Sequence, residues 1–446
     1  MLRKIADHKK ISAALFIIAA ALTAAYFVLC SIASGKANEI FRREMARQQV
    51  LAGRITAADI SADIWGNVYF RRLVWLDDKG EPILDVPSGR LKISMLDVIT
   101  GKITGSSLRE IELNEAALTL GFSKDMKLEM LTKKPPAKKA AQAGAAAGKN
   151  RPARRNRNLQ LPEELPRLEL LLHDCTLTVL NRKRLFRLND VDARIAIANK
   201  QELRISLKTG PFGGTIAGDS LNLSGKAALG TEGQPVSFNL SMYNVIPASL
   251  GLGKVENPAN IGGEVKGSVQ DPKIDGVIRF EELDIPALHF TNVSGNFHYE
   301  DGSVNFTDVT GSVFGGTVEA FGSYDIDSRS YSIDAQGKDL MAAAAAKSTK
   351  INCSVDLDLK MRSEGKPDSV KTYGSFKSGP GSYMLIPFKS ISGKFDDQHK
   401  VLKFADVVIE TELGTVSTDA FSIEKGRVKL NDIYFDAGDG NRLKIR

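Results

Sequence analysis

Residues 355–361 read Val355-Asp356-Leu357-Asp358-Leu359-Lys360-Met361, a strict alternation of apolar and charged side chains. Because successive side chains of a β-strand point to opposite faces, this alternation predicts a strand with one apolar face and one wet face. The same two-residue period recurs in short runs, separated by Gly, Asn, Asp and Ser, along most of the chain after residue 58. The sequence therefore predicts a mainly β protein with almost no helix.

The apolar positions of these runs are the candidate functional residues. The chain offers no substantial set of amphipathic helices that could cover a wide apolar sheet face. Two arrangements stay open: the sheet curls until its own side chains meet, or it stays open and lipid tails occupy the groove. The candidates for a lipid-contacting face are Ile93, Leu203, Ile205, Leu207, Phe238, Leu240, Val304, Phe306, Ile333, Val355, Leu357 and Leu359.

An internal repeat extends the strand pattern. Val293-Ser294-Gly295-Asn296-Phe297 recurs 98 positions later as Ile391-Ser392-Gly393-Lys394-Phe395, and Phe212-Gly213-Gly214 recurs 102 positions later as Phe314-Gly315-Gly316. Units that pair with their neighbours lengthen a sheet without a closed globular core. We expect an elongated, curled antiparallel β-sheet groove built from repeats of about 100 residues, with the paired glycines at turns or bends.

The start of the chain predicts a membrane anchor. Residues 11–32 form a charge-free, mostly apolar run of 22 residues, preceded by Arg3, Lys4, Lys9 and Lys10. At ~1.5 Å per residue, a helix of this length spans ~33 Å and can cross a hydrocarbon core of ~30 Å. By the positive-inside rule, the N-terminus stays in the cytoplasm, and the rest crosses the inner membrane in a single pass into the periplasm.

A basic segment dominates the net charge of +7, because residues 132–160 carry nine Lys or Arg and no acid. Its composition predicts a disordered linker. The remainder therefore predicts no nucleic-acid surface. The expected domains are 1–35, a cytoplasmic tip and transmembrane anchor; 36–131, an N-terminal β region; 132–160, the linker; and 161–446, the repeated β-groove region.

The sequence predicts no catalytic or metal site. A nucleophile elbow, a P-loop, a dinucleotide fingerprint and a zinc-type cluster are all missing from it. His173-Asp174-Cys175 comes nearest to a reactive cluster, but on a regular strand His173 and Cys175 share a face while Asp174 points away. Cys175 and Cys353 could form one disulfide, although free thiols are the expectation. We therefore expect no enzymatic activity and no cofactor.

Several stretches resemble the AsmA-like family of envelope proteins (AsmA/TamB type). The resemblance covers most of the chain and rests on the anchor followed by residues 66–78, on the Phe-Gly-Gly-Thr stretches at Phe212 and Phe314, and on residues 267–276. It implies a long β-sheet curled into an open groove, anchored in the inner membrane and lying in the periplasm. It also implies an apolar groove that conducts phospholipid acyl chains, as in the bridge-like lipid-transfer proteins.

Two functions are therefore expected. The first is an inner-membrane-anchored periplasmic protein that binds phospholipid along its groove and supports envelope lipid transport and outer-membrane biogenesis. The alternative is a structural or assembly factor that engages an outer-membrane β-protein, or another envelope protein, through the sheet edge at residues 401–446. Neither function needs a nucleic-acid partner.

Overall fold

The computed structural model describes residues 26–43, 53–100, 107–122, 167–181, 184–198, 202–228, 234–247, 255–268, 271–285, 288–398, 401–424, 427–438 and 442–445. The protein is mainly β, as predicted. The chain divides into two compact units, residues 1–238 (unit 1) and residues 239–446 (unit 2), each of which is considered by itself. Besides helical residues 26–43, the described helices are α2 (Met95–Thr100), α3 (Ala342–Ala345) and the single-turn 3-10 helix η4 (Pro367–Ser369).

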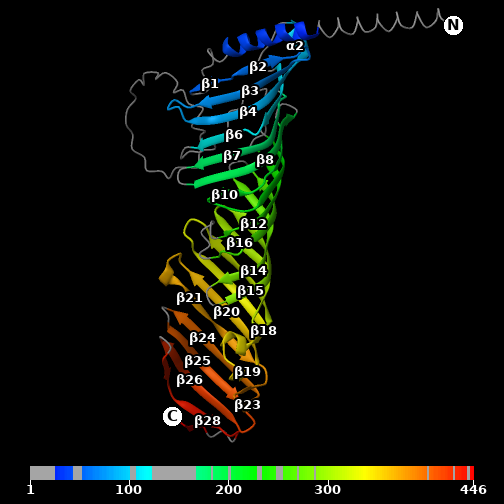
Figure 1. The fold of residues 1–446 in the computed structure, drawn as a ribbon. Helices are drawn as coiled ribbons and strands as arrows, with labels where there is room; N and C mark the ends of the chain where they lie inside the picture. Colours follow the sequence, from blue (N-terminus) through cyan, green and yellow to red (C-terminus); the bar gives the residue numbers. More distant parts are fainter. Residues whose placement is uncertain are drawn as a thin grey trace, which may run out of the picture. The chain divides into compact units, whose positions relative to one another are not determined.

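Unit 1 is built on a mixed sheet (Figure 1). Its strands are β1 (Arg54–Thr56), β2 (Asp59–Ala62), β3 (Asn67–Leu76), β4 (Pro82–Ile93), β5 (Leu108–Asn114), β6 (Ala117–Phe122), β7 (Glu169–Asn181), β8 (Arg184–Ala198), β9 (Glu202–Lys208), β10 (Phe212–Gly214) and β11 (Ser220–Ala228). β1 and β2 both pair with β3, β3 pairs with β4, and β4 pairs with β5 and β6. β7 pairs with β8, β8 pairs with β9 and β10, and β9 pairs with β11.

The expectation of a purely antiparallel sheet is wrong at β7, which runs parallel to both β5 and β6. Parallel neighbours need a connection of about a dozen residues or more. Residues 123–166, which lie outside the described residues and include the predicted linker at 132–160, separate β6 from the described start of β7. Alternation of apolar side chains is the same in parallel and antiparallel strands, so it could not reveal this reversal.

Unit 2 carries a curled sheet whose described pairings are all antiparallel (Figure 1). In chain order its strands are β13 (Ala259–Gly267), β14 (Pro272–Ile285), β15 (Leu288–Glu300), β16 (Ser303–Val313), β17 (Gly316–Asp325), β18 (Tyr331–Met341), β20 (Ser354–Ser363), β21 (Lys371–Ser378), β24 (Ser390–Gln398), β25 (Val401–Glu410), β26 (Thr415–Glu424), β27 (Arg427–Leu430), β28 (Ile433–Asp436) and β29 (Arg442–Lys444). A separate small sheet contains β19 (Ile351–Asn352), β22 (Gly381–Tyr383) and β23 (Ile386–Phe388), and β12 (Val236–Val245) crosses the division between the units.

Many strands carry a β-bulge at an acidic or amide residue with positive φ. Asp308 has a φ of 51°, and the pairing of β15 and β17 with β16 shifts register around it. The left-handed conformation costs most residues ~1–2 kcal/mol and is tolerated best by Gly, Asn and Asp. The other residues of this kind at a shift of register are Asp174, Asp190, Asn292, Asp339 and Asp406, and an apolar residue or cysteine follows each of them.

Each bulge resets the alternation of the strand. On β16, Phe306 and Val309 lie on the same face although three positions separate them, because Asp308 is the extra residue between them. The freed backbone N–H often meets a side chain on the next strand: that of Asp174 donates to Asp192 at 3.2 Å and that of Asp339 to Asp356 at 3.0 Å. Bulges bend and twist strands. The apolar face therefore stays continuous while the sheet curls.

The sequence offset of 98 corresponds to a repeated local structure. β16 begins at Ser303 and β25 at Val401, 98 positions later, and both strands are bulged at equivalent aspartates, Asp308 and Asp406, each with a φ of 51°. The Phe314-Gly315 pair forms the tight turn between β16 and β17, with φ values of 52° and 78°. The glycine there lies at a turn, as expected.

The predicted anchor at residues 11–32 falls largely outside the described residues. The helix that is described covers residues 26–43. In the described parts of the chain, no helix combines the length and the apolar character that crossing a membrane would require.

Replacing Asp308 tests the contribution of a left-handed bulge residue. Asp308→Val should lower the free energy of unfolding by about 1–2 kcal/mol, because a β-branched residue is strained at positive φ. Asp308→Gly, which removes the same carboxylate but accepts this φ, should stay within about 0.5 kcal/mol of the parent. Urea unfolding of the full-length protein, followed by circular dichroism, measures both; equal midpoints for the two variants would contradict the assignment.

Candidate functional site

One face of unit 2 carries an unbroken row of apolar residues that crosses nine strands. Directly paired residues of neighbouring strands project from the same face of a sheet. The row, called the apolar row below, consists of Val309, Ala320, Ala335, Leu359, Gly374, Phe395, Phe404, Phe421 and Leu430. Each member is half-buried or exposed, so protein atoms cover this row only partly.

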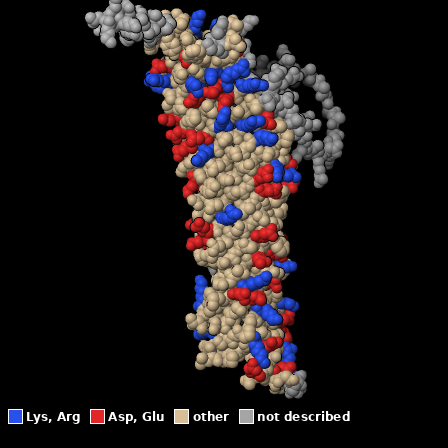
Figure 2. Space-filling view, turned by 90° about the vertical axis from the view of Figure 1, so that its right-hand side faces the viewer, with Lys and Arg blue, Asp and Glu red and all other residues tan. Residues whose placement is uncertain are grey.

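The opposite face of the same strands is polar. The residues paired there, one position from the apolar row, are Glu319, Gln336, Asp358, Ser375 and Lys394. Ion pairs lie on this outer face, such as Arg362 with Asp334 at 2.8 Å and Lys394 with Asp406 at 3.0 Å. On the side of the molecule drawn in Figure 2, Lys and Arg side chains lie near Asp and Glu side chains, with uncharged surface between these groups. Each exposed pair contributes little to the free energy of folding, but the charged side chains keep this face in contact with solvent.

A hollow follows the apolar row. Its volume is about 1110 Å³, and it is lined by Val309, Ala320, Ala335, Leu359 and Phe395 of the row together with polar residues that flank the row in each strand, such as Glu319, Asp358 and Ser375. A second hollow of about 400 Å³ continues beside Phe395, Phe404 and Phe421. Since Phe395 lines both hollows, they adjoin along the row.

Glycines and phenylalanines are matched across the strands of this face. Gly374 lies opposite Phe395, and a Cβ added to Gly374 would overlap the carbonyl oxygen of Asp358 and approach the Phe395 ring at 3.0 Å. Gly276 and Phe297 form the equivalent pair 98 positions earlier. The rings therefore lie over glycine backbone. Phe404 also stacks on Phe421, with ring centroids 4.7 Å apart.

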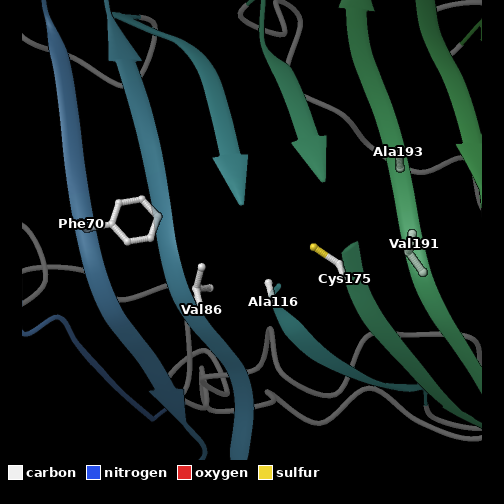
Figure 3. Packing of buried hydrophobic residues seen from close by; sticks show 6 residues of the cluster. All are labelled: Phe70, Val86, Ala116, Cys175, Val191 and Ala193. Atoms are coloured by element: carbon white, nitrogen blue, oxygen red, sulfur yellow. The ribbon is translucent and has the colours of Figure 1, made fainter. Parts of the chain in front are cut away.

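Unit 1 has a comparable apolar face, and part of it is sealed by protein. One row runs through Val68, Leu91, Ile111, Leu170, Ile195 and Ile205 to Gly225. Beside it, Phe70, Val86, Ala116, Cys175, Val191 and Ala193 form a buried cluster (Figure 3). Val86 and Val191 are completely buried, and each such side chain contributes about 1.5–3 kcal/mol. This part of unit 1 has a packed core.

All twelve candidate residues from the sequence are half-buried in the structure. Those of unit 2 that lie in β16, β18 and β20 share the face of the apolar row: Val304, Phe306, Ile333, Val355, Leu357 and Leu359. In unit 1, Ile93 of β4 and Leu203, Ile205 and Leu207 of β9 share the apolar face. Phe238 and Leu240 alternate with exposed residues in β12.

The sequence reasoning missed Phe395, Phe404 and Phe421 as members of this face. Bulges and single polar interruptions leave no long alternation around them, for example at Lys403-Phe404-Ala405-Asp406. The signal that could have found Phe395 is the repeat itself, because it places Phe395 at the position of Phe297, opposite an equivalent glycine.

The nearest approach to a reactive cluster does not form a catalytic group. Asp174 is a bulge residue, and the thiol of Cys175 is buried at 3% exposure while His173 is exposed. Burial raises the pKa of the Cys175 thiol, whereas a nucleophilic cysteine needs a lowered one. Cys175 and Cys353 are both free thiols. Within the described residues, no group of three or more His, Cys, Asp and Glu is arranged to hold a metal ion.

Histidines of unit 2 take part in charge networks on the outer face. His298 contacts Asp275 at 2.6 Å and Glu300 at 3.4 Å, and His289 contacts Asp284 at 2.7 Å. Hydrogen bonding to Asp275, and then to Glu300, raises the pKa of His298, and bonding to Asp284 raises the pKa of His289. Both imidazoles therefore hold a proton more tightly in the folded protein.

Comparison with protein-family models, with curated proteins and with solved structures finds no match to this chain.

The fit of ring against glycine gives a stability prediction. Gly374→Ala should lower the free energy of unfolding by about 1–3 kcal/mol, because the added methyl group meets backbone and the Phe395 ring. Gly262→Ala is the matched control, since a Cβ there meets nothing within 4 Å. Thermal unfolding of the full-length variants compares them, and an equal change at both positions would contradict the packing described.

The charge network gives a pH prediction. Because folding raises the pKa of His298, its contribution to stability is fully present below the unfolded value of about 6.5 and is lost as the pH rises through the folded value. Asp275→Asn should lower the His298 pKa and weaken the protein near pH 6 but not above pH 8. Proton NMR titration measures the change in the His298 pKa, and the pKa of His289 should stay the same in the variant.

Proposed function

We propose that this protein binds lipid acyl chains along the apolar face of its curled sheet. The observation that carries the proposal is the apolar row of unit 2, a row of side chains across nine strands that protein covers only partly. Soluble proteins rarely expose contiguous apolar surface unless a ligand, a membrane or a partner covers it. A phospholipid acyl chain is an occupant whose chemistry matches a row without polar groups.

The length of the row suits such an occupant. Strands of a sheet lie about 4.8 Å apart, so the seven steps from Val309 to Phe421 extend over at most roughly 34 Å. The acyl chains of one leaflet reach across about 15 Å, half of a hydrocarbon core of about 30 Å. The row exceeds one acyl chain, so lipid could move along it without leaving apolar surroundings.

The difference between the units also favours an open site in unit 2. In unit 1, the buried cluster around Val86 and Val191 supplies protein contacts to the apolar face. In unit 2, Leu359 and Phe395 border a hollow of about 1110 Å³. Ala320, Ala335 and Gly374, which also line this hollow, leave room above the row because they have a methyl group or no side chain at all.

The wider function that we propose follows the resemblance to AsmA-like proteins: an inner-membrane-anchored periplasmic protein that conducts phospholipid and supports envelope lipid transport. No covalent chemistry is needed in this function. Lipid would move along the row down a gradient between membranes.

Carboxylates on the apolar face should abolish lipid binding. The double variant Leu357→Asp/Leu359→Asp should carry at least tenfold less phospholipid than the parent, since a charge beside an acyl chain is strongly unfavourable. The measurement is mass spectrometry of lipids extracted from the purified full-length protein.

The matched control is Ser332→Asp/Ser392→Asp, which adds the same two carboxylates to the outer face, where Ser332 pairs with Arg362 and Ser392 with Lys377 and neither residue lines the hollows. The control should keep its lipid, and circular dichroism should show both variants folded. Equal lipid content in the two variants would overturn the proposal. If the parent carries no phospholipid and crosslinks to an envelope protein from the sheet edge at residues 401–446, the predicted alternative of an assembly factor is favoured instead.

A further inference from the structure

The two margins of the unit 2 sheet differ in chemistry. Because β16 to β26 are antiparallel, their connections alternate between the two margins of the sheet. One margin carries the charged turns Asp327-Ser328-Arg329 and Glu364-Gly365-Lys366. The other carries the exposed apolar side chains Met341, Tyr383, Met384, Leu385, Ile386 and Leu413, called the apolar rim below.

The apolar rim is centred on the hairpin of β22 and β23. Tyr383 pairs with Ile386, and Met384 and Leu385 form the two-residue tip between them. Leu385 is 95% exposed, and Leu413 on the turn between β25 and β26 is 83% exposed. Four consecutive large apolar residues at a hairpin tip are costly in water, so the tip needs an apolar environment.

The hairpin is held firmly in this outward position. Its small sheet with β19 stands apart from the main sheet, and the backbone N–H of Met384 donates to the carbonyl oxygen of Lys350 at 2.5 Å. At its base Phe388 is buried, and the N–H of Lys389 donates to Glu410 of β25 at 2.7 Å. The base is therefore anchored in the fold, while the tip projects.

The connections that carry the tip are basic, whereas Glu410 and Glu412 precede Leu413 on the neighbouring connection between β25 and β26. The two segments that build the small sheet, residues 341–355 and 376–394, contain five lysines and no Asp or Glu. Lys389 and Lys394 are paired with Glu412 and Asp406. Lys347 and Lys350 are exposed on the connection that leads into β19, the strand paired with the hairpin.

We infer that the apolar rim inserts into the interface of a lipid bilayer that contains anionic lipid. Met384, Leu385 and Ile386 would enter the boundary between headgroups and acyl chains, as the apolar faces of interfacial segments do. Tyr383 has the amphipathic ring that is enriched at this depth. Lys347 and Lys350 would contact the anionic headgroups. This membrane contact is separate from the predicted N-terminal anchor and does not require lipid in the apolar row.

Tryptophan at the tip tests the inference directly. The full-length protein with Leu385→Trp is reconstituted into vesicles of brominated phosphatidylcholine with brominated phosphatidylglycerol, and its fluorescence is compared with that of the parent, which has Trp65 and Trp75. The new tryptophan should be quenched at least twofold more than the parent signal. Phe321→Trp is the control, because Phe321 is 60% exposed on the outer face of β17 and should not be quenched.

A further pair of variants separates this inference from the proposed lipid groove. Leu359→Trp reports lipid in the apolar row, whereas Leu385→Trp reports contact of the rim with the bilayer. Adding Lys347→Gln/Lys350→Gln to the Leu385→Trp protein should lower its quenching in the anionic vesicles at least twofold, and adding them to the Leu359→Trp protein should leave its quenching unchanged. Quenching at residue 359 alone would overturn the rim inference and leave the groove intact.

Two other results would also overturn the inference. One is equal quenching of Leu385→Trp and Phe321→Trp. The other is self-association through the rim. In that case the Leu385→Trp protein is not quenched by the vesicles, and the triple variant Met384→Ser/Leu385→Ser/Ile386→Ser converts an oligomer into a monomer in light scattering. The occupant of the rim would then be a second copy of the chain.

Discussion

The structure depends on one constraint: the apolar side chains of each strand must stay on a single face although the strands bend. A regular strand that bends sharply would lose its pairing or turn its apolar residues outward. The left-handed residues Asp174, Asp190, Asp308 and Asp406 each add one residue to the strand and restore the face after the bend. The backbone strain of these positions is the cost of a curled sheet with a continuous apolar surface.

That continuity gives the two faces of unit 2 opposite properties. Val309, Leu359 and Phe404 belong to a row without polar side chains, and residues next to them in the chain, such as Thr310, Asp358, Lys360 and Lys403, lie on the opposite face. The outer ion pairs add little free energy individually. These charged side chains determine which face of the sheet is exposed to water. The opposite, apolar face is then available to contact a ligand or to pack within the protein.

The two units use this surface differently. In unit 1, Val86 and Val191 are fully buried within a cluster, and this packing stabilises the sheet. In unit 2, the apolar row borders a hollow, and the apolar rim exposes Leu385 and Leu413. A protein that conducts acyl chains needs surfaces of the second kind, and these surfaces support the proposed function and the proposed bilayer contact.

The sequence by itself determined the mainly β fold and which residues of β9 and β20 lie on the apolar face. Alternation of apolar and polar residues, as in Val355 to Met361, places side chains on opposite faces through local backbone geometry alone. The repeat at 98 residues also predicted equivalent strands. Only the tertiary structure decided that β7 runs parallel to β5 and β6, that Phe395 and Phe404 align in one row, and that residues 383–386 project from the margin. These features depend on pairing partners, on single-residue bulges and on loop placement, which local alternation does not encode.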